Sequence, residues 1–268
     1  MGIIPDYRTR IYDRYTTEKL PYLLELTDAE YRRWAAACQH RLRGWLPSDR
    51  EARCLDVACG HGNFLYLLKE AGYHNIVGID VSPEQAAVAR RVWPDVECAN
   101  VLDYLPGHAG EFDLITGFDI IEHLHKSEVL TFLDLISKAL RPGGSVILQT
   151  ANAESPWGGM HRYHDFTHET GYDPASLDHL FRVVGLEGFE ARECGPYIHG
   201  AASMARTAIW KVIHAGLSVW NVAETGSRGS GVYTRIFAGR AQRPAKPAPH
   251  HYGTASVEST RLASPTAR

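Results

Sequence analysis

The stretch CLDVACGHGNFLYLL, residues 54–68, constrains the fold more than any other part of this 268-residue chain. An apolar run leads to Asp56, two glycines follow at Gly60 and Gly62, and an amphipathic run begins at about Asn63. Glycines let a backbone turn sharply and approach a ligand, because they carry no Cβ. The free N–H groups of a new helix then favour a negatively charged group. We predict a buried strand, a ligand-binding turn and a helix.

The same alternation of strands and helices continues to about residue 150. Short apolar runs alternate with stretches whose apolar residues are three or four apart, as in a parallel sheet built from β-α-β units. The predicted strands are RCLDVA (53–58), NIVGID (75–80), VECAN (96–100), FDLITGFD (112–119), GSVILQT (144–150), FEARECG (189–195) and GVYTRIFAG (231–239). The turn motif RPGG (141–144) is expected to end a helix. We predict a Rossmann-like α/β fold with a doubly wound, mostly parallel, seven-stranded sheet.

The flanks of this region differ from it in composition. Residues 1–50 read as an N-terminal helical cap, residues 51–240 as the α/β domain, and residues 241–268, with four prolines, as a disordered tail. The segment 203–220 is amphipathic, and we expect its apolar stripe to belong to the core. That stripe consists of Ile209, Trp210, Ile213, Leu217 and Trp220.

Composition limits the function classes. Lysine and arginine number 28 against 31 aspartate and glutamate, a formal net charge of -3, so nothing indicates a nucleic-acid partner. No apolar run approaches the ~18 residues needed to cross a bilayer, and the N-terminus lacks the apolar segment of a signal peptide. Five cysteines without a CxxC pair predict reduced thiols rather than disulfides or a structural zinc site. We expect a cytoplasmic protein.

A carboxylate follows the glycine turn at the end of the second predicted strand. Asp80 stands where an acid accepts hydrogen bonds from a ribose diol, which indicates a nucleoside-type ligand. The third glycine of the dinucleotide fingerprint is replaced by Leu65, which disfavours NAD. The alternative is a tight turn in which Asp80 only caps the next helix.

Residues 50–150 contain several motifs that resemble, in the same order along the chain, those of class I S-adenosylmethionine-dependent methyltransferases. LDVACGHG resembles the first motif, with Asn63 replacing its third glycine, and VGIDVSPEQ contains the ribose-binding acid. ANVLDYLP resembles the adenine-contacting motif, with Asn100 where an Asp is more usual. FDLITGFDIIEHL and LRPGGSVIL resemble the fourth strand and the turn before the fifth. The resemblance implies S-adenosylmethionine as the cofactor.

The resemblance also implies which residues bind this cofactor. Asp56 and Gly60 would hold its methionine end and Asp80 its ribose, while Asn100 would meet the adenine amine. Val81 and Val101 would pack on the adenine ring. The complete set expected at the cofactor site is Asp56, Ala58, Gly60, Gly62, Asp80, Val81, Asn100, Val101 and Phe118.

Ionisable residues directly follow the fourth predicted strand. Asp119, Glu122 and His123 form a D-x-x-E-H pattern similar to the E-x-x-E-H of ubiquinone-pathway O-methyltransferases, where those residues hold a divalent cation. Carboxylates with one imidazole accept Mg²⁺ and suit Mn²⁺ or Zn²⁺. The alternative is that His123 lies beside the acceptor, or caps a helix, without any metal.

A second group of ionisable residues follows the fifth predicted strand. The stretch GMHRYHDFTHET, residues 159–170, allows three interpretations. It could be a solvated lid over the acceptor or a zinc site. It could also supply a general base, because imidazole titrates near neutral pH. The pattern RYHDFTHETGYDPASLDHLFRVVG (162–185) resembles a segment of bacterial methyltransferases of polysaccharides and sugar-containing natural products. That resemblance favours Asp165 and His168 as acceptor-site residues.

These observations lead to one functional prediction and two alternatives. We predict methyl transfer from S-adenosylmethionine to a hydroxyl of a sugar or glycan intermediate, with His168 or His123 as base and Asp165 as orienting partner. The first alternative is O- or N-methylation of a phenolic or amine natural product. The second is a non-catalytic scaffold that binds S-adenosylmethionine. The expected partners are a small-molecule or oligosaccharide acceptor and a second copy of the chain.

Overall fold

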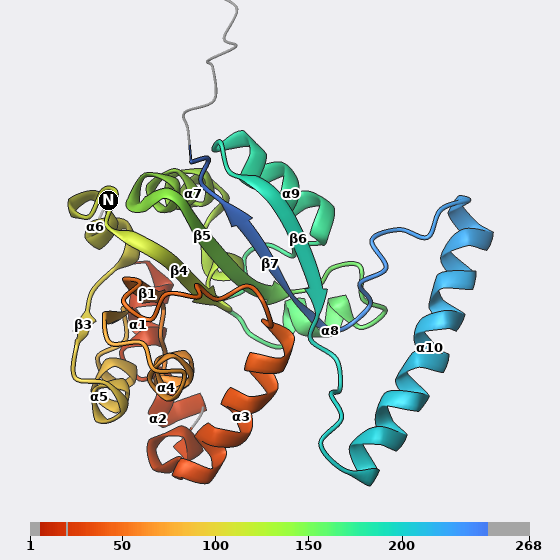
Figure 1. The fold of residues 1–268 in the computed structure, drawn as a ribbon, viewed down its shortest axis with the longest axis horizontal. Helices are drawn as coiled ribbons and strands as arrows, with labels where there is room; N and C mark the ends of the chain where they lie inside the picture. Colours follow the sequence, from red (N-terminus) through yellow and green to blue (C-terminus); the bar gives the residue numbers. More distant parts are fainter. Residues whose placement is uncertain (1–5, 20, 246–268) are drawn as a thin grey trace, which may run out of the picture.

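The predicted strands form one seven-stranded sheet in the computed structural model, which describes residues 6–19 and 21–245 (Figure 1). The strand order is β3-β2-β1-β4-β5-β7-β6, and only β7 runs antiparallel to its neighbours. The strands are β1 (Cys54–Val57), β2 (Ile76–Asp80), β3 (Val96–Cys98), β4 (Phe112–Phe118), β5 (Leu140–Ala151), β6 (Glu187–Glu193) and β7 (Ile236–Gln242). The predicted Rossmann-like, mostly parallel fold is confirmed.

Several strand boundaries differ from the prediction, among them those of β6 (predicted at 189–195) and β7 (predicted at 231–239). RPGG does not form a free turn, because residues 141–144 already belong to β5. Residue 243 extends the pairing there: Gly143 N donates to Arg243 O at 2.9 Å, and Arg243 N donates to Gly144 O at 2.9 Å. The start of the predicted tail, residues 241 and 242, is the end of β7. The remainder of that tail from residue 246 lies outside the described residues.

Helices cover both faces of the sheet. The α-helices are α1 (Tyr7–Tyr12), α2 (Tyr15–Lys19), α3 (Asp28–Arg41), α4 (Asn63–Glu70), α5 (Pro83–Val92), α6 (Val101–Tyr104), α7 (Lys126–Ala139), α8 (Gly158–Tyr163), α9 (Pro174–Val183) and α10 (Ala201–Thr225). The short 3-10 helices are η1 (Pro21–Glu25), η2 (Leu105–Gly107) and η3 (Ile121–His123). The helical cap predicted at residues 1–50 contains α1, α2 and α3, and the amphipathic segment 203–220 lies within α10.

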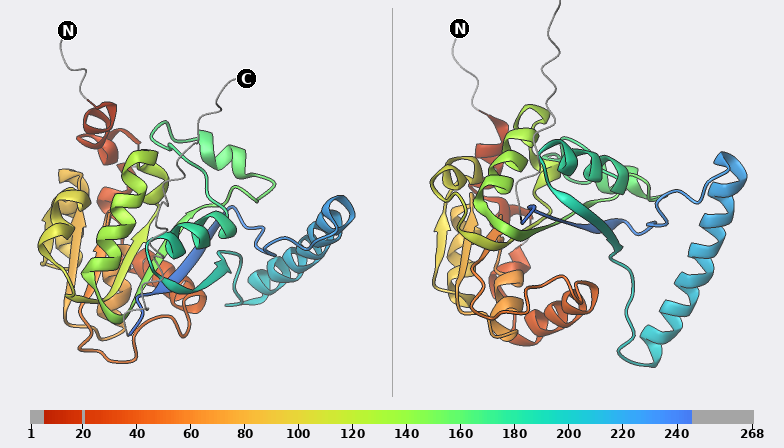
Figure 2. Two further views of the ribbon diagram at one scale, coloured as in Figure 1. Left: turned by 90° about the horizontal axis from the view of Figure 1, so that it is seen from above. Right: turned by 45° about the horizontal axis from the view of Figure 1, so that its top comes forward.

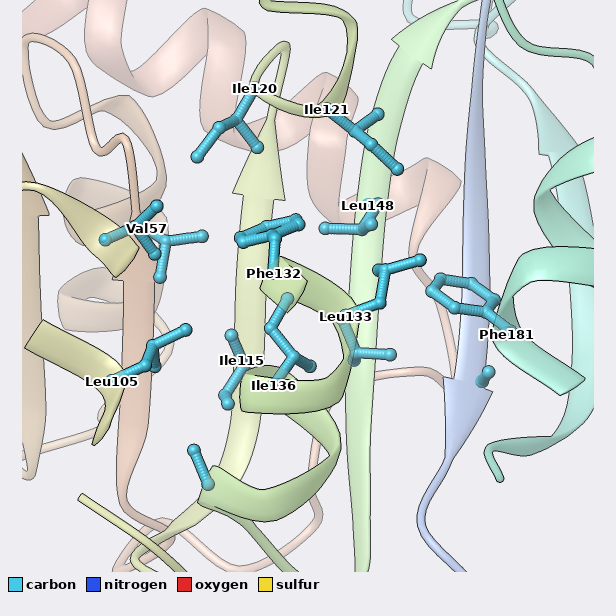
Figure 3. Close-up of a cluster of buried hydrophobic side chains, with 14 of the residues drawn as sticks. Val57, Leu105, Ile115, Ile120, Ile121, Phe132, Leu133, Ile136, Leu148 and Phe181 are labelled. Carbon is cyan, nitrogen blue, oxygen red and sulfur yellow. The ribbon is translucent and has the colours of Figure 1, made fainter. Parts of the chain in front are cut away.

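Two apolar clusters separate the helices into layers. One cluster joins α3, α4 and α5 to the sheet through Tyr31, Phe64 and Ala86. The other joins α7 and α9 to the opposite face, where Phe132 and Phe181 are fully buried (Figure 3). Strands β1 and β2 and residues 144–151 of β5 are buried throughout, which explains why they read as nearly continuous apolar runs.

Helix α10 stands away from the rest of the molecule in all three views (Figures 1 and 2). Ile209 and Trp220 of its apolar stripe are 60% and 67% exposed. The expectation that this stripe belongs to the core is therefore wrong. An amphipathic pattern shows that one helix face is apolar, but it does not say what covers that face. Within the described residues, no helix combines the length and hydropathy needed to span a bilayer.

Candidate active site

The turn after β1 has the conformation that its glycines allow. Gly60 and Gly62 have φ values of 57° and 89°, in the left-handed region that favours glycine, and Gly62 is the N-cap of α4. A Cβ on Gly62 would lie 3.2 Å from Ala89 Cα in α5. Gly62 therefore lets α4 and α5 approach each other. Ala58 takes a φ of 53° without being glycine, which concentrates backbone strain beside the turn.

Asp80 ties this turn to the end of β2. Its carboxylate accepts hydrogen bonds from Gly60 N and Ser82 N, both at 2.8 Å. Burial raises the pKa of Asp80 to about 6. The cap of α5 is Ser82, whose hydroxyl accepts from Gln85 N, so the alternative reading of Asp80 as a helix cap is wrong. The carboxylate instead holds the turn against the neighbouring strand.

A cavity of about 390 Å³ opens beside Asp80, a volume typical of small-molecule sites. Seven of the nine residues expected at the cofactor site line this cavity. They are Ala58, Gly60, Asp80, Val81, Asn100, Val101 and Phe118. The exceptions are Gly62, which packs on α5, and Asp56. Thr116 Oγ1 donates to Asp56 Oδ1 at 2.7 Å beneath the turn, and burial raises the pKa of Asp56 to about 7.

The first two helices cover the same cavity. Tyr12 and Tyr15 lie in its wall, and we call residues 7–19 the N-terminal cover. Arg8 holds the cover to α7 through two hydrogen bonds to the Glu128 carboxylate, at 2.7 and 2.8 Å. Glu84 of α5 accepts from the backbone N–H groups of residues 16 and 17, each at 3.0 Å. The cover is thus attached on both sides of the cavity.

His123, the last residue of η3, lies in the cavity wall. Its Nδ1 is 2.8 Å from Thr167 Oγ1, and its ring centroid is 4.6 Å from that of His168 in an edge-to-face arrangement. Burial, and to a smaller extent the neighbouring His168, lower the pKa of His123 to about 4. Such an imidazole is neutral at physiological pH, so it has a lone pair to accept a proton.

Asp165 lies behind Thr167 and faces the N-terminal cover. Its carboxylate accepts from Tyr15 OH at 2.9 Å, forms an ion pair with Lys19, and accepts from both the N–H and the hydroxyl of Thr167, at 2.9 and 2.7 Å. Burial alone would raise the pKa of Asp165, but the hydrogen bonds from Lys19 and Thr167 hold it well below its usual range. Asp165 is therefore a fixed negative charge.

His168 occupies a different position from His123. It is 8% exposed and is not among the residues that line the cofactor cavity. Its Nδ1 donates to His161 O at 2.9 Å, which anchors the ring within the histidine-rich loop, residues 159–170. Of the two histidines predicted as candidate bases, the structure places His123 at the cavity and His168 behind it.

The predicted metal ligands are only partly brought together. One possible ligand atom from each of Glu122, His123 and His168 lies within 4.8 Å of the other two. Asp119 is outside this group. Gln149 Nε2 donates instead to both carboxylate oxygens of Asp119, at 3.3 Å. One carboxylate and two imidazoles form a donor set that suits Mn²⁺ or Zn²⁺ better than Mg²⁺.

Several residues of this site were not identified from sequence. Tyr12, Tyr15 and Lys19 of the cover were assigned only to a helical cap, and Thr167 was not singled out. The available signal was the D-x-T spacing of Asp165 and Thr167, which favours a side-chain-to-backbone turn. The structure contains this turn, with Thr167 N donating to Asp165 Oδ1.

Comparison with known proteins decides the family. Residues 29–191, more than half of the chain, match the model of a family described as a methyltransferase domain. The chain belongs to this methyltransferase family. A methyltransferase needs a cofactor pocket at the carboxyl ends of the strands, and the cavity beside Asp80 lies there.

Curated relatives of this methyltransferase include enzymes of ubiquinone biosynthesis. The ubiquinone biosynthesis O-methyltransferase of Aromatoleum aromaticum is 32% identical over 108 residues, which cover 37% of this chain and 44% of that protein. The enzyme of the same name from Hydrogenovibrio crunogenus is 29% identical over 154 residues, covering 49% and 61%. The methyltransferase thus spans about half the length of the curated relatives it matches.

Solved structures share the fold of this methyltransferase. A SAM-dependent methyltransferase from Archaeoglobus fulgidus has a TM-score of 0.60 at 19% identity, covering 84% of this chain and 100% of that chain. N-methyltransferase NodS from Bradyrhizobium japonicum, in complex with S-adenosyl-l-homocysteine, has a TM-score of 0.55 at 17% identity, covering 89% and 100%. The family confirms the predicted methyltransferase class, and the solved structures confirm its fold.

Proposed function

We propose that this chain transfers a methyl group from S-adenosylmethionine to a phenolic hydroxyl of a small molecule. The observation that carries the proposal is the neutral imidazole of His123 in the wall of the cofactor cavity. The curated relatives are named for O-methylation, which favours an oxygen acceptor over a nitrogen acceptor. Those relatives are not named as sugar methyltransferases, so the sugar or glycan acceptor has no support from them.

The acidity of the acceptor also favours a phenol over a sugar. A phenolic hydroxyl has a pKa near ~10, as in tyrosine, whereas the pKa of water is about 15.7 and an alkyl hydroxyl resembles water more closely. Burial leaves His123 a weak base, because its pKa is lowered to about 4. A weak base assists a more acidic hydroxyl more effectively. Aromatic side chains at the cavity, Tyr12, Tyr15 and Phe118, suit a flat ring.

The cofactor-side residues have separate roles in this proposal. Asp80 would accept hydrogen bonds from the ribose diol, and the turn at Gly60 would hold the methionine portion. Asn100 meets the adenine, with Val81 and Val101 on the faces of the ring; all these residues line the cavity. Asp56 and Gly62 act indirectly, since one lies beneath the turn and the other joins α4 to α5.

The reaction is an in-line displacement. When bound, S-adenosylmethionine supplies an electrophilic methyl group on a sulfonium centre. His123 would accept the proton of the acceptor hydroxyl at Nε2, and the oxygen would take the methyl group as the sulfonium becomes a thioether. The products would be a methyl ether and S-adenosylhomocysteine, and His123 would then release its proton to water.

A divalent cation is the second candidate for activating the hydroxyl. Glu122, His123 and His168 would hold it, and it would stabilise the negative charge that develops on the acceptor oxygen. Burial and the charge of Asp119 raise the pKa of Glu122 well above its usual range, which favours a protonated Glu122 rather than a ligand. We therefore assign His123 the role of base.

The test is a panel of phenol, sugar and amine acceptors, scored by incorporation of a labelled methyl group. We expect methylation of phenols. His123→Ala should lower kcat by about 100- to 10,000-fold, the usual contribution of a positioned base. Its affinity for S-adenosylhomocysteine, measured by calorimetry, should remain within about threefold, because the cofactor contacts are elsewhere.

The control is His74→Ala, since His74 is exposed. It should leave both quantities unchanged. Preferential methylation of a sugar would contradict the acceptor class, and full activity of His123→Ala would contradict the base. Absence of methyl transfer to the whole panel, with cofactor binding intact, would favour the non-catalytic scaffold.

A further inference from the structure

We infer that Thr167 positions His123 and fixes its neutral imidazole in the form with the proton on Nδ1 and the lone pair on Nε2. Thr167 is fully buried and does not line the cofactor cavity, so its effect on the reaction passes through His123. The catalytic consequence rests on the proposed function, whereas the position of the proton does not.

The contacts form a chain of three side chains. His123 Nδ1 lies 2.8 Å from Thr167 Oγ1, and Thr167 Oγ1 lies 2.7 Å from Asp165 Oδ1. Both distances are those of good hydrogen bonds. The backbone N–H of Thr167 also donates to Asp165 Oδ1, at 2.9 Å, which keeps the threonine in place independently of its hydroxyl.

Counting protons along this chain decides the form of the imidazole. A threonine hydroxyl carries one proton, and an ionised carboxylate can only accept. At 2.7 Å, the Thr167 hydroxyl must donate its proton to Asp165. It then has only lone pairs for His123, so Nδ1 must carry the donated proton. In a neutral ring Nε2 is then the nitrogen that accepts a proton.

The N-terminal cover keeps Asp165 ionised. Lys19 forms an ion pair with Asp165, and Tyr15 OH donates to Asp165 Oδ2 at 2.9 Å. Both groups stabilise the negative form of a carboxylate that is 6% exposed. The cover thus influences His123 from a distance, through Asp165 and Thr167.

The adjacent histidine does not supply a competing proton. His168 Nδ1 lies 2.9 Å from His161 O, and a carbonyl only accepts, so the ring proton of neutral His168 is on Nδ1. His168 therefore has no proton on Nε2 to donate to His123. Tyr12 stands edge-on to His123, with ring centroids 6.4 Å apart.

Kinetics of two Thr167 variants test the positioning role. Thr167→Val keeps the side-chain volume but removes the hydroxyl, and we expect kcat to fall by about 10- to 100-fold, as when the orienting partner of a histidine is lost. The KM for S-adenosylmethionine should change less than about twofold. Thr167→Ser restores the hydroxyl and should recover kcat to within about threefold of the original chain. Equal kcat values for all three proteins would overturn the inference, as would a serine variant as slow as the valine variant.

Nitrogen NMR of ¹⁵N-histidine-labelled protein tests the proton position without any acceptor. The signals of His123 are identified as those lost in His123→Gln. We expect a protonated Nδ1 and an unprotonated Nε2 in the original chain, and a shift toward protonated Nε2 in Thr167→Val. A protonated Nε2 in the original chain would overturn the inference. If no acceptor is methylated, the proposed function fails, yet this spectrum still supports or overturns the role of Thr167.

Discussion

The two sides of the cavity are built by different means. On the cofactor side, main-chain atoms dominate: within the turn, Gly60 N donates to Asp80 of the next strand and Gly62 N donates to Cys59 O. On the acceptor side, the important contacts join side chains, as where the hydroxyl of Thr167 lies between His123 and Asp165.

This difference determines how each side can change. Glycine turns and strand ends are encoded by neighbouring residues, and altering them alters the fold. The acceptor side joins residues distant in sequence, such as Lys19 and Asp165, which are 146 positions apart. A single substitution there can change reactivity while the sheet stays intact. The cofactor side is therefore the more constrained half, and the acceptor side is the more adaptable one.

The largest effect is expected from breaking the cofactor side. Asp80→Ala should lower the affinity for S-adenosylhomocysteine by about 100-fold, because the variant loses a charged acceptor for two ribose hydroxyls, worth about 3 kcal/mol. Calorimetry measures the change. Asp95→Ala, at an exposed position before β3, is the matched control. Unchanged binding by Asp80→Ala would remove the cofactor assignment from this cavity.

A smaller effect is expected from the acceptor side. Lys19→Met removes the cationic partner of Asp165 and should lower the free energy of unfolding at pH 7 by on the order of 1 kcal/mol, given the partial exposure of the lysine. That corresponds to about 2–4 °C in Tm. Affinity for S-adenosylhomocysteine should stay within about threefold.

The ion pair of Lys19 and Asp165 also predicts how the stability of the folded chain depends on pH. The pKa of Asp165 is lower in the folded chain, so its stabilisation is present above the unfolded pKa of about 3.8 and is lost as pH falls further. The Tm difference between Lys19→Met and the original chain should therefore narrow below about pH 4. Lys69→Met, an exposed lysine of α4, should show no difference at either pH. A constant difference across this range would mean that Lys19 acts without Asp165.

The smallest effect is expected from metal removal. EDTA treatment should change kcat by less than about twofold, and adding Mg²⁺, Mn²⁺ or Zn²⁺ should not raise it, because the proposal uses His123 as a proton acceptor. A base and a metal ligand would compete for the same nitrogen lone pair of His123. Loss of activity in EDTA with recovery in Mn²⁺ would assign that lone pair to a metal held with Glu122 and His168.

Much of the fold was predictable because its signals are local. Buried parallel strands give continuous apolar runs, and the turn after β1 contains the glycines that its positive φ values favour. The extension of β5 through residues 141–144 was not predictable, because it depends on pairing with residue 243. The exposure of α10 was also missed, since helical periodicity does not indicate whether a partner is present.

The residues of the candidate site also differ in whether local sequence could identify them. Asp80 and Gly60 could be placed from motif order alone. His123 could be named but not ranked above His168, because only the three-dimensional arrangement places one ring at the cavity and the other behind it. Thr167 was missed because threonine has no distinctive chemistry until a carboxylate and an imidazole lie on either side of it.

The strand order has a consequence for the way the chain is made. Strand β7 lies between β5 and β6, although it is the last of the seven to be synthesised (Figure 1). In a growing chain, β6 has no strand to pair with until β7 has been made. The edge of β5 also remains unpaired until residue 242 has left the ribosome. Because open edges invite pairing with other chains, incomplete copies of this protein are exposed to aggregation throughout the synthesis of α10.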